Sequence, residues 1–137
     1  MDRTLIANAM ILDGSGAAPF AGDVLVEGQR IASVQRGGGL PRGGARVIDG
    51  AGATLMPGLV EPHGHVSYPD AASNADFTRL PPEEHVLVTM RNARTMLDCG
   101  YTSVLSGAAA KPRLDTVIRN EINAGRIPGP RYLANGP

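Results

Sequence analysis

The sequence predicts an α/β fold in two parts: a small β-sheet or sandwich, then a parallel sheet with helical crossovers. Residues 1–56 contain several short β-type runs separated by glycine-rich turns. Residues 57–137 alternate strand-type and helix-type patterns, as parallel sheets do. A closed (β/α)8 barrel needs about 250 residues. The second part is therefore long enough only for the first three strands and two helices of such a barrel.

The elements of the first part follow from its apolar runs and the turns between them. Gly28-Gln29 separates two of these runs as a hairpin turn would. The glycine-rich run over 37–44 lacks the strand-to-helix context and the lysine of a phosphate-binding loop, so we interpret it as a connector. Strands are expected over 4–12, 23–27, 30–35, 46–49 and 54–56.

The second part begins with Leu59-Val60, which is apolar on consecutive positions as expected for a strand covered on both faces. The elements then expected are a helix opened by the prolines at 81–82 and ended by Gly100, a strand over 102–105, a helix opened by Pro112 and ended by Gly125, and a strand over 131–134. The apolar faces are Val86, Met90, Ala93 and Leu97 on the first helix and Leu114, Val117, Ile118 and Ile122 on the second.

Composition excludes several classes of function. With 42% hydrophobic and 19% charged residues, the chain fits a globular protein rather than a disordered one. Its 13 basic and 13 acidic residues give no net charge, and with few aromatics this argues against nucleic-acid binding. No apolar run is long enough to span a membrane. Cys99, the single cysteine, is expected to be a buried structural thiol in a reducing, cytoplasmic protein.

Two of the three histidines, His63 and His65, stand one residue apart after the apolar run at 59–60. If that run is a strand, both imidazoles point to one face, where they could bind a divalent metal such as zinc. Judged on spacing alone, two polar loop residues are the commoner explanation. The surrounding motifs decide between these interpretations.

The surrounding motifs are the segments 10–16, 22–31, 47–52, Met56-Pro-Gly-Leu-Val-Glu-Pro-His-Gly-His65, 100–104 and 122–131. Any one of them is a weak signal, but their ordered combination along nearly the whole chain is specific. Together they resemble the N-terminal part of the amidohydrolase superfamily, in the branch of imidazolonepropionase-like and prolidase-like metal-dependent hydrolases. Two departures are Glu61, where the family usually has Asp, and Ser106-Gly107, where it often has Arg-Asp. The second departure is expected to alter the mouth of the active site.

The resemblance implies a β-sandwich domain, begun by residues 1–56, beside a metal-dependent-hydrolase TIM barrel begun by residues 57–137. It implies that His63 and His65 bind one or two divalent ions, most often zinc, at the mouth of the barrel. The remaining ligands and a catalytic Asp would come from later strands, so no catalytic residue lies in this fragment. Its implied partners are a small-molecule substrate, the C-terminal piece completing the barrel and, once complete, further copies of the enzyme.

Other polar residues near the motif have two interpretations each. We interpret His85, in the first turn of a helix, as a surface or helix-packing residue rather than a ligand. Tyr68 and Asp70 either line a pocket, with Tyr68 binding substrate, or belong to an ordinary solvated loop. Glu61 either orients an imidazole or points to the bottom of the barrel as a structural hydrogen-bond partner, and we favour the latter.

Three functions are compatible with these residues. The first is hydrolysis of a C–N bond, in an amide, cyclic amide or dipeptide-like substrate, by a metal-bound hydroxide once the missing strands complete the site. The alternative is a non-catalytic family member or fragment that serves as a binding or structural piece. A third is a stand-alone module, whose exposed sheet edge and apolar faces would make it self-associate.

Overall fold

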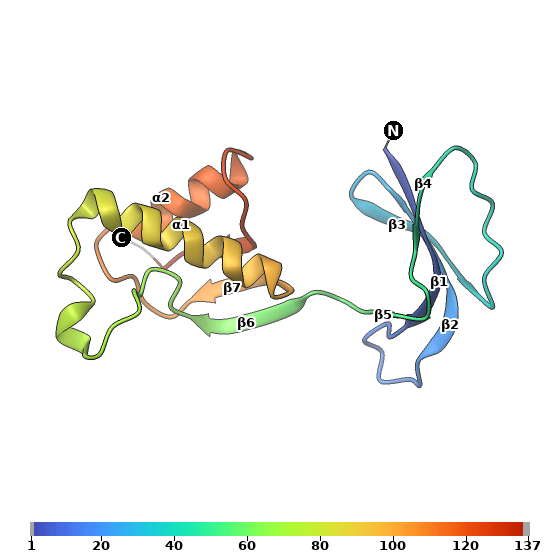
Figure 1. Cartoon of the computed structure of the whole chain (residues 1–137), viewed down its shortest axis with the longest axis horizontal. Coiled ribbons are helices and arrows are strands. Elements are labelled where there is room, and N and C mark those ends of the chain that lie inside the picture. The colour runs from blue at the N-terminus through green and yellow to red at the C-terminus, as the bar shows by residue number, and fades with distance from the viewer. Residues whose placement is uncertain (1, 136–137) are drawn as a thin grey trace. The chain divides into compact units, whose positions relative to one another are not determined.

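The computed structural model describes residues 2–135, which fall into two compact units, one ending at Pro57 and one starting at Gly58 (Figure 1). The sequence analysis places its division one residue earlier, between residues 56 and 57. Each unit has its own sheet and its own buried cluster, so the two are described in turn.

The first unit is a five-stranded sheet. Its strands are β1 (Arg3–Ile11), β2 (Phe20–Glu27), β3 (Arg30–Arg36), β4 (Arg46–Asp49) and β5 (Thr54–Leu55). The order is β3-β2-β1-β4, with β5 also paired to β1. The pairs β1–β2 and β2–β3 are antiparallel, whereas β4 and β5 run parallel to β1 and pair with successive stretches of it. All five predicted strands are present, but residues 2–57 form one sheet without the second layer of a sandwich.

A carboxylate beneath the glycine-rich connector organises this sheet. Asp23 is 4% exposed, and its oxygens accept backbone N–H groups from Asn8 at 3.0 Å, Gly39 at 2.7 Å and Leu40 at 3.1 Å. These hydrogen bonds, the largest from Asn8, lower the pKa of Asp23 and outweigh the opposing effect of burial. The bond from Asn8 also stabilises an irregularity in β1, where Asn8 has a φ of 56°.

The second unit is a parallel three-stranded sheet in the order β6-β7-β8. Its elements are β6 (Leu59–Gly64), a short 3-10 turn (Asn74–Asp76), α1 (Pro82–Asp98), β7 (Tyr101–Ser106), α2 (Leu114–Asn123) and β8 (Arg131–Leu133). Figure 1 shows both helices on the same side of the strands. The predicted alternation and parallel pairing are confirmed, whereas a closed barrel is not seen among three strands.

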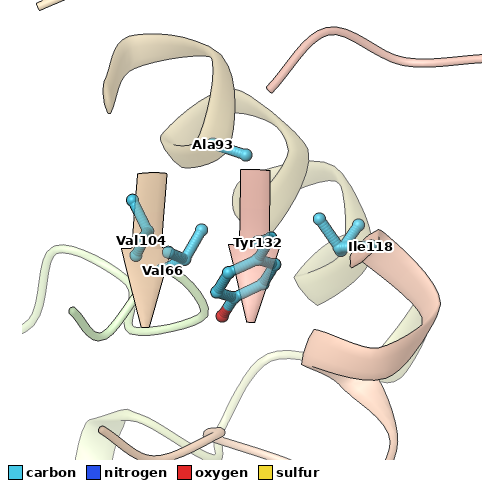
Figure 2. Close-up of a cluster of buried hydrophobic side chains, with 5 residues drawn as sticks. All are labelled: Val66, Ala93, Val104, Ile118 and Tyr132. Atoms are coloured by element: carbon cyan, nitrogen blue, oxygen red, sulfur yellow. The ribbon is translucent and has the colours of Figure 1, made fainter. Parts of the chain in front are cut away.

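The core of this unit lies between the sheet and its two helices (Figure 2). Val104 and Tyr132 from the strands meet Ala93 and Ile118 from the helices, and Val66 closes the cluster. The opposite face of the sheet is open: Val60 is 65% exposed, Leu105 is 45% exposed and Leu133 is 58% exposed. The unit is therefore buried on one side of its sheet only.

Helix α1 packs Val86, Met90 and Ala93 of its predicted stripe against the core, and it also buries His85 and Thr89. Two other predictions about burial are wrong in detail. Helix α2 buries Asp115 and leaves Val117 exposed, because the carboxylate has a partner on β7. Cys99 is exposed, because it follows the last turn of α1 instead of lying within the buried face. Among residues 2–135, no helix combines the length and apolarity that crossing a membrane requires.

Candidate metal centre

The two histidines of the motif come together at the carboxyl end of β6. His63 lies in the strand and His65 follows its last residue. Their ring centroids are 5.0 Å apart and the rings are almost perpendicular. The pairing of β6 with β7 shifts register between Glu61 and Gly64, next to the two histidines. The His-x-His pattern therefore brings the rings into contact, as the sequence predicts.

The segment after β7 forms the wall behind both rings. The Gly107 N–H donates to the Gly64 carbonyl at 2.8 Å, which joins the two strand ends. The ring of His63 lies against the Gly107 backbone. The Nδ1 of His65 faces the carbonyl of Ala108 at 3.4 Å. Since a carbonyl only accepts, Nδ1 is the donor in this long contact, and Nε2 is left for a metal.

An aromatic stack holds the ring of His65 from the other side. The Tyr68 ring stacks on His65 with centroids 4.3 Å apart and an angle of 18°, and Phe77 packs on Tyr68 at 4.3 Å. The structure thus places Tyr68, predicted to bind substrate, directly beside a predicted ligand. Asp70 lies elsewhere, on a hollow of about 630 Å³ between the following loop and α1, and the histidines do not line that hollow.

Side chains of α1 hold the loop that follows the motif. His85 is fully buried, and its Nε2 lies 2.6 Å from the Ser67 carbonyl, so this nitrogen is the donor. Asn92 donates to the carbonyls of Val66 and Tyr68, both at 2.9 Å. The helix-packing interpretation of His85 is confirmed and the surface one is wrong. Neither this role nor that of Asn92 could be found from apolar periodicity, because both side chains are polar.

Glu61 contacts the backbone of the motif instead of a ring. Its Oε1 accepts the N–H of His63 at 2.9 Å. Glu61 is thus a structural hydrogen-bond partner, but it lines one hollow with His63 and His65 instead of pointing away from them to the bottom of the barrel. By fixing the amide of His63, Glu61 constrains the backbone from which that ring projects.

A buried polar cluster lies at the carboxyl end of β7 and β8. Ser106 donates its hydroxyl hydrogen to Asp115 Oδ2 at 2.5 Å, and both residues are buried. The Tyr132 phenol is directed toward the arrowhead end of its strand (Figure 2). Burial, aided by Asp115, raises the pKa of Tyr132 far above its ordinary range and keeps the phenol protonated. The sequence analysis assigned no role to Asp115 or Tyr132.

The separation of the two imidazole rings has the size that a shared zinc ion would require. Zn–N bonds of 2.0–2.1 Å in tetrahedral geometry place the ring centres of two imidazole ligands about 5 Å apart. The observed separation of 5.0 Å has that size. Within residues 2–135, no group of three or more His, Cys, Asp or Glu side chains is gathered to hold a metal ion. The described residues thus provide two ligands, fewer than the three of a typical catalytic zinc.

Comparison with known proteins gives relatives of one kind. No protein-family model matches the chain. A dihydroorotase from Streptomyces coelicolor is 32% identical over 116 residues, which cover 85% of this chain and 23% of the relative. A 5-methylthioadenosine/S-adenosylhomocysteine deaminase from Symbiobacterium thermophilum is 33% identical over 150 residues, covering 93% of this chain and 34% of the relative.

Solved structures of similar proteins superpose on this chain. An amidohydrolase superposes with a TM-score of 0.82 at 27% identity, over 98% of this chain and 31% of that one. A prolidase crystallised with N-methylphosphonate-L-proline superposes with a TM-score of 0.80 at 28% identity, over 98% of this chain and 32% of the prolidase chain. The chain therefore spans about a quarter to a third of the proteins it matches. The resemblance to the amidohydrolase superfamily, including its prolidase-like branch, is confirmed.

Proposed function

We propose that this chain supplies the first two metal ligands, His63 and His65, of a hydrolase that cleaves a C–N bond. The observation that carries the proposal is the contact between the two imidazoles at 5.0 Å, at the carboxyl end of a parallel strand. The similar proteins, among them a dihydroorotase, a deaminase and a prolidase, are hydrolases acting on C–N bonds. The substrate class is accordingly an amide, a cyclic amide or a dipeptide-like molecule.

Each nearby residue has a distinct part in this proposal. A bound zinc ion would supply Lewis acidity and lower the pKa of its water to about 7. Glu61 holds the backbone of His63, and Ala108 orients the ring of His65 through Nδ1. Tyr68 shields one face of His65, and it would contact a substrate bound beside that ring. The proton-transfer residue and the further ligands would come from outside this chain.

The open face of the second sheet supports the proposal that more of the enzyme covers it. Val60, Leu105 and Leu133 are apolar and 45–65% exposed on that face. Burying apolar surface is worth about 25 cal/mol per Å², so water is an unfavourable neighbour for them. We expect the 137-residue chain to self-associate when it is alone. A cooperatively folded, monodisperse monomer in sedimentation or light scattering would contradict this expectation.

The metal site is tested by adding Co²⁺ to the chain and following its histidine ring signals by NMR. Binding at the proposed site broadens the Hε1 signals of His63 and His65. His85 is the internal control, because its ring is buried and its Nε2 is bound to Ser67. His63→Ala and His65→Ala should each greatly weaken binding, since each removes one of two ligands. Broadening that is equal for all three rings, or that is undiminished at the remaining ring in either single variant, would refute the site.

Residues that lie outside this chain decide whether the complete protein is catalytic or non-catalytic. Hydrolysis requires at least one further histidine or carboxylate ligand and a proton-transfer group from the rest of the enzyme. We expect the isolated chain to bind metal weakly and to turn over no amide substrate. If the complete protein has no such residues in the remaining strands, the catalytic function fails while metal binding by the pair can persist.

A further inference from the structure

The ring of His63 occupies the space in which a side chain at position 107 would lie. A β-carbon at Gly107 would be 2.6 Å from His63 Nε2, 2.7 Å from Cδ2 and 2.9 Å from Cε1. Real β-carbons do not approach other atoms so closely. Gly107 is not among the glycines with positive φ, so its backbone angles do not demand glycine. The requirement at this position is one of space for an imidazole.

Gly107 itself is held firmly. Its N–H donates to the Gly64 carbonyl at 2.8 Å, on the neighbouring strand. The preceding residue, Ser106, is bonded to Asp115 at 2.5 Å, and the Asp115 side chain is fully buried at the start of α2. The backbone against which the His63 ring packs is therefore hydrogen-bonded to β6 through Gly107 and to α2 through Ser106.

We propose that Gly107, held by the buried hydrogen bond between Ser106 and Asp115, is the positioning residue for the His63 imidazole. The inference rests on the metal site proposed above and gives a reason for glycine at this point of the chain. Residues that orient a metal ligand without touching the metal commonly account for about 10–100-fold in metal affinity. Gly107 acts by shape, since the ring can pack against a backbone that carries no side chain.

Gly107→Ala tests the inference. The added β-carbon meets the far end of a flexible side chain, so the His63 ring should turn away while the strand ends stay paired. We expect the affinity for Co²⁺ to fall about 10–100-fold. We also expect the nuclear Overhauser contacts between the His63 ring and position 107, which the wild-type chain should show without metal, to disappear. Ala109→Ser, which adds one atom two residues along the same loop, is the control and should bind Co²⁺ like wild type.

The hydrogen bond behind Gly107 is tested by a pair of variants. Ser106→Ala removes the hydroxyl, so we expect weaker His63 contacts at position 107 and a lower Co²⁺ affinity. Asp115→Asn keeps an oxygen acceptor for Ser106, so it should retain most of both. If Asp115→Asn lost as much affinity as Ser106→Ala without unfolding, the carboxylate would have another role and this part of the inference would be wrong.

Co²⁺ binding by the variants distinguishes failure of this inference from failure of the metal site. If His63→Ala abolished Co²⁺ binding and Gly107→Ala did not change it, the site would stand and the inference would be overturned. If wild type and His63→Ala bound Co²⁺ equally, the metal site itself would be refuted. If the wild-type chain showed no contact between the His63 ring and the α-protons of Gly107, the inference would be overturned without any variant.

Discussion

The two units bury polar side chains very differently. Among residues 2–57 Asp23 is the one buried polar residue, whereas residues 58–135 bury Ser67, His85, Thr89, Ser106 and Asp115. Burying a polar group is costly unless it is hydrogen-bonded, and most of these groups have a partner. Polar groups are thus concentrated in the unit whose strand ends carry the histidines.

The two units differ in what their buried polar groups are bonded to. In the first unit the carboxylate of Asp23 fixes a connector, and the rest of its interior is apolar packing. In the second unit His85 and Ser67 bond to the two loops that begin at the carboxyl ends of β6 and β7. In the first unit the buried polar side chain therefore fixes a connector, whereas in the second unit the buried polar side chains hold the loops beside the two histidines.

The largest expected effect breaks the second unit and leaves the first intact. Ile118→Ala empties a fully buried position between α2 and the sheet, and should lower the free energy of unfolding by about 3 kcal/mol. All three tyrosines lie after residue 57, so tyrosine fluorescence during urea unfolding reports this unit alone. The neighbouring Val117→Ala, at a residue 37% exposed, is the control and should cost much less. Equal losses would contradict the packing described for α2.

The next effect tests whether polar burial holds the loop after β6. His85→Ala removes the donor to the Ser67 carbonyl and leaves a cavity, and should destabilise the second unit by about 2–3 kcal/mol. Hydrogen exchange of the amides of Val66, Ser67, Tyr68 and Asp70 should accelerate more than that of β7. Leu87→Ala, two residues along and 58% exposed, provides the comparison. If both variants exchanged alike over this loop, the role assigned to His85 would be wrong.

A smaller and pH-dependent effect belongs to the first unit. Asp23→Asn keeps the shape but removes the charge that accepts three amides, and should cost about 1–2 kcal/mol at neutral pH. The folded-state pKa lies below the ordinary value of 3.8. The stability that the Asp23 charge contributes is therefore fully present at pH values above the pKa of the unfolded state. It is lost as the pH falls through the lower pKa of the folded state.

Hydrogen exchange of β1 and β2, measured as a function of pH, checks this prediction. The difference in protection between wild type and Asp23→Asn should be constant at neutral pH and shrink in acid. Tyrosine fluorescence of the second unit should be unaffected. A difference that grows on acidification would mean that the carboxylate is not stabilised in the folded state.

The smallest expected effect concerns the surface of α1. Arg94 and Asp98 form an i,i+4 ion pair at 2.7 Å, with both side chains 56% exposed. Solvent and salt screen such pairs, so Arg94→Ala should cost only about 0.3–0.5 kcal/mol. The loss should disappear in high salt. A loss comparable to that of His85→Ala would mean that exposed charge contributes as much to this unit as polar burial does.

Local patterns were enough to predict where the elements lie and that His63 and His65 meet. Apolar alternation and turn residues give all five strands of the first unit and the strand–helix order of the second. They do not give the pairing of β4 and β5 with β1, because contacts between distant segments leave no local signal. Nor do they locate the wall behind the rings, since a glycine that makes room for an imidazole looks like any loop glycine.

Polar residues on helices caused the remaining errors. The stripe of Val86, Met90, Ala93 and Leu97 predicts the apolar contacts of α1, but it gives no sign that His85 and Thr89 are fully buried beside it. Asp115 in a first turn is typical of a solvated charge near a helix start, yet it is fully buried with Ser106. Burial of this kind depends on a partner supplied by another element, and a single-segment pattern contains no information about that partner.

The exposed thiol that follows α1 has a practical consequence. Because Cys99 is the single cysteine and is accessible, a maleimide dye or spin label can be attached to the second unit at one known point without any substitution. The same accessibility lets two chains cross-link through a disulfide in air. Measurements of particle size on this protein should therefore be made with a reductant present, so that association through apolar faces is not confused with covalent dimers.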